Sequence, residues 1–171
     1  MPTITRQPTD LQKAVEVLLY VTARMPVMYR ALKAIYFADK QHLLKYGGLM
    51  YGEAYIAMEH GPVPSTAYDI VKVALPPCTC DDMTRARALF QHADRQLVPA
   101  REANLDYLSE SDMECLDEAI AQIAALPNAE LQRISHEDPA YKATDDNDAM
   151  TLEGIAESLG DPDLLAHLRD G

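Results

Sequence analysis

Acidic and histidine side chains that could serve acid–base catalysis or metal binding occur in three segments of the chain. Asp39 and His42 stand three residues apart in a helical pattern, so they share a face. Glu59 and His60 are adjacent, and His136 begins the run His-Glu-Asp. The spacing does not match H-E-x-x-H, and the sequence contains no G-x-x-x-x-G-K phosphate loop and no G-x-S-x-G nucleophile elbow. We therefore expect that the protein is not an enzyme and uses no cofactor, with structural roles for His60 and His136.

The cysteines give no clear sign of a disulfide framework or a metal centre. There are three of them, Cys78, Cys80 and Cys115. An odd number without a signal peptide argues against paired disulfides. Cys78 and Cys80 form a C-x-C pair after two prolines, but a zinc site normally takes four ligands, and no second pair or nearby His-x-His follows. Two thiols in a loop are the simplest interpretation, and their role is left open.

The length and hydropathy of the chain indicate a folded domain without a membrane-spanning segment. The chain has 171 residues, of which 48% are hydrophobic, so it can form a core. It contains no apolar run near the roughly 20 residues that span a bilayer. The first ten residues, MPTITRQPTD, lack the apolar stretch of a signal peptide. We expect one cytoplasmic domain that spans residues 1–171.

The net charge of −12 is distributed unevenly along the sequence. Residues 1–101 contain 12 basic and 9 acidic residues, whereas residues 102–171 contain 3 basic and 18 acidic ones. The acidic half is either a well-solvated surface or a face that attracts a basic partner, and it would repel nucleic acid. Arginines at positions 85, 87, 95 and 101 form a weak basic patch, for which an intramolecular or partner carboxylate is the expected contact.

The helix that must position Asp39 is expected to begin at about Pro26 and to lie at the centre of the domain. Its apolar residues occupy two opposite faces, so it is covered on more than one side. The first face carries Met28, Leu32, Ile35, Leu43 and Tyr46, and the second carries Phe37 and Leu44. Gly47 and Gly48 end it. Asp39 lies within the apolar stripe, either as a structural carboxylate held by a backbone amide or a tyrosine hydroxyl, or facing a binding groove.

A strand, a turn and a helix are predicted next. Alternation over residues 53–59 is typical of a half-buried strand. Residues 61–64, Gly-Pro-Val-Pro, are expected to break it rigidly. Ser65 or Thr66 would cap a helix that continues through Ile70, Val71 and Ala74.

The flanking segments are mostly helical in pattern. A first helix is predicted from Thr9, with a Thr9–Gln12 capping box, to Pro26, which would open the central helix. Residues 78–86 are interpreted as a loop, and ALFQH and RQLVPA as a hairpin beside the strand at 53–59. Ser109 and Asp112 form a capping box for a helix that ends at Pro127.

The last third of the chain continues this pattern. Asn128 is expected to cap the helix AELQRISH, and residues 137–150 to be irregular. Short helices start at Thr151 and at Asp161-Pro162. The predicted class is mainly α (α+β): a single compact helical domain with a small antiparallel β-sheet.

A set of spaced residues resembles the Panacea domain, also called the SocA-like antitoxin domain. The set comprises Lys33, Tyr36, Asp39, Gly47, Gly52-Glu53-Ala54-Tyr55, Gly61-Pro62-Val63 and Tyr68. The segments LSESDMECLDEAI and LQRISHEDPAYKA are similar to the second half of that domain, so the resemblance runs from about Thr9 to Lys142, with short helices at 151–169 beyond it. Tyr141 stands where the family more often has tryptophan, which keeps an aromatic ring.

The resemblance implies an antitoxin of a bacterial or phage toxin–antitoxin system. Such a protein neutralises a toxin encoded by an adjacent gene, by binding it. The SocA type is implied to act instead as a proteolytic adaptor that delivers its toxin to the ClpXP protease. Both modes stay open, as does a homo-oligomer.

The expected toxin-binding surface is the end of the central helix together with the strand and the Gly-Pro turn. Its members are Tyr36, Asp39, Tyr55, Glu59, Gly61, Pro62 and Tyr68. Tyrosines suit such an interface because they bury area and keep a polar tip, although each of these residues could also be structural. Two alternatives stay open: a metal-dependent hydrolase, and a DNA-binding autorepressor that would use the exposed arginines.

Overall fold

The structure is a computed structural model that describes residues 6–73 and 80–170, most of them helical. In chain order the elements are α1 (Leu11–Arg24), α2 (Met28–Tyr46), β1 (Tyr55–Met58), β2 (Gly61–Pro64), α3 (Ser65–Val71), α4 (Asp81–Ala88), β3 (Phe90–Ala93), β4 (Gln96–Pro99), the 3₁₀ turn η1 (Leu105–Tyr107), α5 (Glu110–Ala124), α6 (Asn128–Glu137), α7 (Pro139–Lys142), α8 (Leu152–Ser158) and α9 (Pro162–Asp170). The predicted mainly α class with minor antiparallel strands is confirmed, but the strands form two separate two-stranded sheets.

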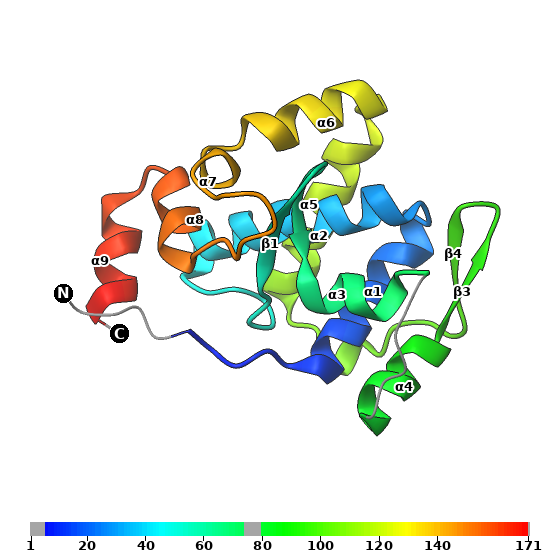
Figure 1. The fold of residues 1–171 in the computed structure, drawn as a ribbon. Helices are drawn as coiled ribbons and strands as arrows, with labels where there is room; N and C mark the ends of the chain where they lie inside the picture. The colour runs from blue at the N-terminus through cyan, green and yellow to red at the C-terminus, as the bar shows by residue number, and fades with distance from the viewer. Residues whose placement is uncertain (1–5, 74–79, 171) are drawn as a thin grey trace.

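Helix α2 lies at the centre of the fold, as its two apolar faces predict. It packs against α5 along its length and also contacts α1, β2 and α8 (Figure 1). Ala31, Ala34 and Ala38 are fully buried, and such small side chains allow neighbouring elements to approach closely. The helix ends where predicted, because Gly47 adopts a left-handed conformation with φ 78° and donates its N–H to Leu43 O.

The β1–β2 hairpin replaces the rigid break predicted at residues 61–64. Gly61–Pro64 is a strand that pairs with β1 in antiparallel register, with Ala57 opposite Pro62 and Tyr55 opposite Pro64. The two prolines alternate with Gly61 and Val63, so the nitrogens that lack a hydrogen can all point away from β1. The predicted break is wrong because a proline interrupts a strand only where its nitrogen faces the paired strand, and here it does not have to.

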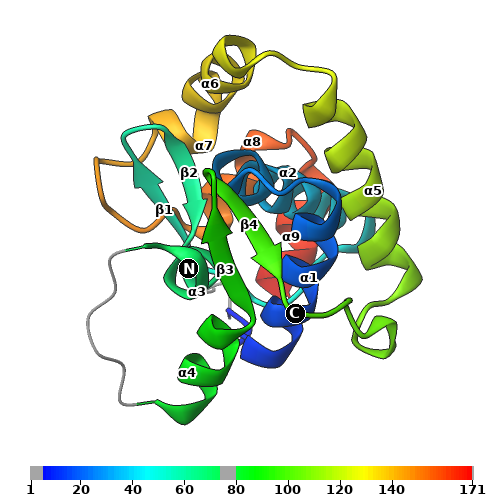
Figure 2. The same ribbon diagram turned by 90° about the vertical axis from the view of Figure 1, so that its right-hand side faces the viewer.

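Residues 147–150 border the other edge of β1. Asn147 N–H donates to Ala57 O (2.6 Å), Ala57 N–H donates to Asp148 O (3.0 Å), and Met150 N–H donates to Tyr55 O (2.8 Å). Figure 2 shows this orange segment beside β1, on the side away from β2. Part of the stretch predicted to be irregular therefore extends the hairpin, and another part forms the short helix α7.

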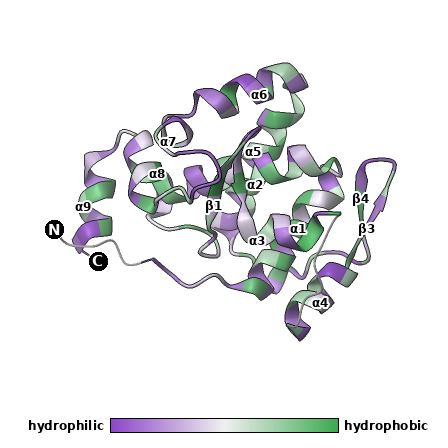
Figure 3. Cartoon of the chain, viewed as in Figure 1, coloured by the Kyte–Doolittle hydropathy of each residue, from purple (hydrophilic) through white to green (hydrophobic). Residues whose placement is uncertain are grey.

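Two clusters of buried apolar side chains make up the interior. One joins α1, α2, α3, β4 and α5, and the other joins α2, β1, α8 and α9. Apolar residues of α1 gather inside, whereas the tip of the β3–β4 hairpin is hydrophilic (Figure 3). None of the helices in residues 6–73 and 80–170 is long and apolar enough to cross a bilayer.

Several predicted helix starts need correction. The Thr9–Gln12 capping box is wrong, because Asp10 caps α1 by accepting from Lys13 N–H, while the Thr9 hydroxyl donates to Gly52 O. Pro26 does not open α2, whose N-cap is Val27. Instead, Pro26 O accepts from Leu97 N–H, so the linker between the helices pairs with β4.

The region around α4 also differs from expectation. Asp81–Ala88 is a helix and not a loop, with two acids in its first turn and two arginines in its last, which complements the helix dipole. The hairpin predicted after it exists as β3–β4, but it lies beside the α1–α2 linker and not beside β1. Cys78 and Ala74 lie outside the described residues.

The later helix starts agree better with the sequence. The Ser109–Asp112 capping box of α5 is confirmed in both directions. The predicted Asn128 cap is wrong, because Asn128 lies inside α6 and its side chain accepts from Arg30 (2.7 Å). Thr151 caps α8 as predicted, and Pro162 is the first residue of α9.

Candidate functional site

The predicted site residues gather on and beneath the β1–β2 hairpin, where it crosses α2. Tyr36 from α2 and Tyr55 from β1 pack with ring centroids 5.0 Å apart, and both are buried. Gly61 and Pro62 begin β2 and are also buried. The fold thus brings the predicted toxin-binding residues close together, although most of them lie in the interior.

Asp39 is a buried carboxylate held by two donors. It is 1% exposed, and it accepts from Met50 N–H (2.7 Å) and from the Tyr55 hydroxyl (2.6 Å). These are the two kinds of partner expected of a structural aspartate. Burial raises the pKa of Asp39 from 3.8 to about 7, although both hydrogen bonds favour the charged form.

Glu53 is a second buried carboxylate, and it joins the start of β1 to the start of α3. One carboxylate oxygen accepts from Ala54 N–H (2.8 Å) and Thr66 N–H (2.9 Å), and the other accepts from the Tyr51 hydroxyl (2.7 Å) and Ala67 N–H (3.1 Å). Glu53 therefore caps α3, and the predicted Ser65 or Thr66 cap is wrong.

Lys33 lies under the first residues of β2. The residue is 1% exposed, and its ammonium donates to Pro62 O (2.7 Å). Burial lowers the pKa of Lys33 from 10.5 to about 7. Gly61 covers it with φ 109°, and an added Cβ there would lie 2.8 Å from Ser135 Cβ and 3.0 Å from Lys33 Nζ, so the close approach requires glycine.

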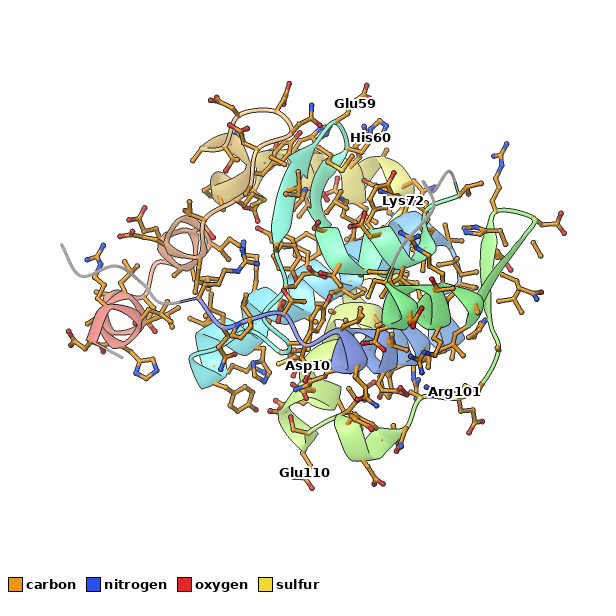
Figure 4. The ribbon with its side chains drawn as sticks, turned by 60° about the horizontal axis from the view of Figure 1, so that its bottom comes forward. Asp10, Glu59, His60, Lys72, Arg101 and Glu110 are labelled. Atoms are coloured by element: carbon orange, nitrogen blue, oxygen red, sulfur yellow. The ribbon has the colours of Figure 1, made fainter. Side chains whose placement is uncertain are left out.

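Only two of the seven predicted site residues are accessible. Glu59 lies exposed at the tip of the hairpin, next to His60 (Figure 4). Tyr68 is half-buried on α3, with Lys72 Nζ 5.5 Å from its ring centroid. The other five are buried: Tyr55, Gly61 and Pro62 within the hairpin itself, and Tyr36 and Asp39 on the part of α2 that supports it.

A groove of about 680 Å³ opens beside Glu59. Its lining comes from the β1–β2 hairpin, α6, α7 and the loop after α7, and consists of Met58, Glu59, His136, Tyr141, Asp146 and Asn147. The Tyr141 hydroxyl donates to Met58 O (2.7 Å), and His136 Nε2 lies 2.8 Å from Glu59 O. Of these lining residues, only Glu59 belongs to the predicted toxin-binding set. No local pattern predicts that the hairpin tip, the end of α6 and the acidic 145–148 loop converge.

The other chemical candidates have structural partners. His42 does not act with Asp39, because its Nδ1 lies 2.6 Å from Gly48 O and its Nε2 lies 3.3 Å from Asp112. His136 bonds a carbonyl, as expected. Within the described part of the chain, no group of three or more His, Cys, Asp or Glu residues could hold a metal ion.

Three of the four arginines of the predicted basic patch have contacts within the chain. Arg101 forms an ion pair with the buried Glu16 (2.6 Å), and Arg85 forms an exposed one with Asp82 (3.4 Å). Arg87 Nε donates to Asp69 O (3.1 Å). These intramolecular contacts are the kind expected from the sequence.

Comparison with protein families gives one match. Residues 32–142 match the family described as "Antitoxin SocA-like, Panacea domain", which covers well over half of the chain, from within α2 to the end of α7. Neither the curated proteins nor the solved structures contain a match to this chain.

Proposed function

We propose that this chain, which belongs to the family of SocA-like antitoxins that share the Panacea domain, binds and neutralises a protein toxin. The observation that carries the proposal is the family match over residues 32–142. That range contains most of α2, the whole β1–β2 hairpin, and α3, α5 and α6. The toxin would be the product of an adjacent gene, met in the cytoplasm.

The toxin-binding surface is proposed to be the accessible part of the hairpin region. Glu59 at the tip and Tyr68 on α3 would contact the toxin directly. The buried members of the set, with Asp39 and Tyr55 as the pair that joins α2 to β1, would hold this surface in place. A tyrosine with an exposed edge and a charged tip residue are suitable for a protein interface.

The function is tested by co-expressing this chain with the products of the adjacent genes in a bacterial host. We expect one neighbour to arrest growth alone, to be harmless with this chain, and to co-purify with it. The same test in a host without ClpXP separates two modes, because a blocking antitoxin still protects there and an adaptor does not. If no neighbour is toxic and none co-purifies, the proposal is wrong.

The surface is tested by two substitutions at accessible positions. Glu59→Arg and Tyr68→Ala should each weaken toxin binding at least tenfold, as expected for residues at the energetic centre of an interface. Glu157→Arg, at an exposed position on α8, is the matched control and should leave binding unchanged. Equal affinity in all three variants would place the toxin elsewhere on the protein.

A further inference from the structure

The groove beside Glu59 has an aromatic side. His136 and Tyr141 stack with ring centroids 5.6 Å apart and an angle of 15° between the rings. Both are fixed by hydrogen bonds to the hairpin, His136 to Glu59 O and Tyr141 to Met58 O. The rings are therefore a preformed surface, and a ligand that stacks on them would need little rearrangement.

The same groove has an acidic rim. Glu59 and Asp146 are both exposed, and among residues 6–73 and 80–170 neither has a basic partner within 4.0 Å. Both carboxylates are close enough to Tyr141 to affect its hydroxyl electrostatically. Burial raises the pKa of Tyr141, and the negative charges of Asp146 and Glu59 raise it further. The rim thus carries two carboxylates close to an aromatic pair, and neither has a basic partner among the described residues.

We propose that this groove receives an arginine side chain of the toxin, stacked on His136 and Tyr141 between the carboxylates of Glu59 and Asp146. A planar guanidinium can stack on aromatic rings and bind carboxylates at its edge, which a lysine ammonium cannot do in the same way. A groove of about 680 Å³ has room for that side chain and its neighbours. The excess of acids in residues 102–171 would steer a basic partner toward it.

This assignment rests on the proposed antitoxin function for the identity of the partner, but the groove can be tested without the toxin. The probe is N-acetyl-arginine methylamide, added to the isotope-labelled full chain and followed by amide chemical shifts. The citrulline analogue is the control, because it has the same shape and no charge. We expect saturable shifts confined to residues around 58–59, 136–141 and 145–147 with arginine, and none with citrulline.

Substitutions then assign the binding to the two carboxylates. Glu59→Gln and Asp146→Asn should each weaken arginine binding by about fivefold, the upper value for a solvent-accessible ion pair. Glu157→Gln, an exposed acid on α8, should have no effect. Equal shifts with the citrulline analogue, or shifts outside the groove, would overturn the assignment. So would an unchanged affinity for the arginine probe in the double variant Glu59→Gln, Asp146→Asn.

The two proposals fail in different ways. If a toxin is found and the Glu59→Gln, Asp146→Asn double variant binds it as tightly as the wild-type chain, the groove assignment is wrong and the antitoxin function stands. If the arginine probe binds in the groove and no adjacent gene product is toxic or bound, the antitoxin function is wrong and the groove still binds a guanidinium. Loss of toxin binding in the double variant, with retained binding in Glu157→Gln, supports both.

Discussion

Replacing Asp39 by asparagine is expected to remove a specific part of the pH dependence of stability. The carboxyl group is 1% exposed, and burial raises its pKa from 3.8 to about 7. The folded protein therefore holds a proton that the unfolded chain releases between these two values. Because the folded state binds this extra proton, the contribution of Asp39 to the free energy of unfolding is largest in acid and falls as the pH rises toward 7.

The size of the effect follows from the width of that range. One pKa unit corresponds to about 1.4 kcal/mol, so the wild-type protein should lose about 2 kcal/mol from this group between pH 5 and pH 7. Asparagine is neutral at every pH and keeps an oxygen that can accept from Met50 N–H. The Asp39→Asn variant should therefore lack this fall, whatever its stability at any one pH.

Urea unfolding followed by circular dichroism at pH 5, 6, 7 and 8 measures the difference. The quantity to compare is the change of unfolding free energy with pH, at an unchanged dependence on urea. Glu157→Gln, which removes an exposed acid, should follow the wild-type curve. If Asp39→Asn also follows the wild-type curve, the assignment of a protonated Asp39 is refuted.

Three further substitutions test the support of the hairpin. The pKa of Lys33 is lowered to about 7, so the unfolded chain binds the extra proton above that value and wild-type stability should rise by about 2 kcal/mol from pH 7 to pH 9. Lys33→Met should abolish this rise. If urea unfolding still shows the same rise in the variant, the assignment of the lowered pKa to Lys33 is wrong. Glu53→Gln should cost about 3 kcal/mol of unfolding free energy, because the amide group would turn its own N–H donors toward backbone N–H groups. A loss below about 1 kcal/mol in the same assay would show that α3 does not need the cap from Glu53. Gly61→Ala should cost about 2 kcal/mol of unfolding free energy, because of its φ of 109° and the contact of the added Cβ with Ser135. Gly48→Ala is the control, because an added Cβ there meets nothing within 4 Å. Equal melting temperatures for the two variants would be inconsistent with the close approach at Gly61.

The helical part of the fold could be predicted because its signals are local. The two apolar faces of α2 and the Ser109–Asp112 capping box of α5 lie within a few residues of what they determine. The same holds for the Thr151 cap of α8. Glu53 is different, because it caps a helix whose amides lie 13 and 14 residues away. A cap at that separation exists only once β1 and α3 are packed, so no local pattern indicates it.

The candidate site was harder to predict than the fold. Tyr36, Asp39 and Tyr55 do lie together, but spacing does not show whether a cluster faces solvent or the interior. The strand at Gly61–Pro64 was missed for a related reason, since its prolines are tolerated only through the direction they face. The groove is built by the hairpin tip with residues 136–147, and their proximity depends on long-range packing.

The edge pairing of β1 shows that the part of the chain needed for experiments is longer than the segment that matches the family. The family match ends at residue 142, whereas the backbone partners of Tyr55 and Ala57 are residues 147–150. A fragment trimmed to the matched range would leave that strand edge open, with unpaired amides and carbonyls that can template intermolecular β-pairing. It would also lose α1, which supplies much of the larger buried cluster. We therefore expect such a fragment to aggregate. A fragment of this chain made for binding studies should extend beyond the matched range at both ends.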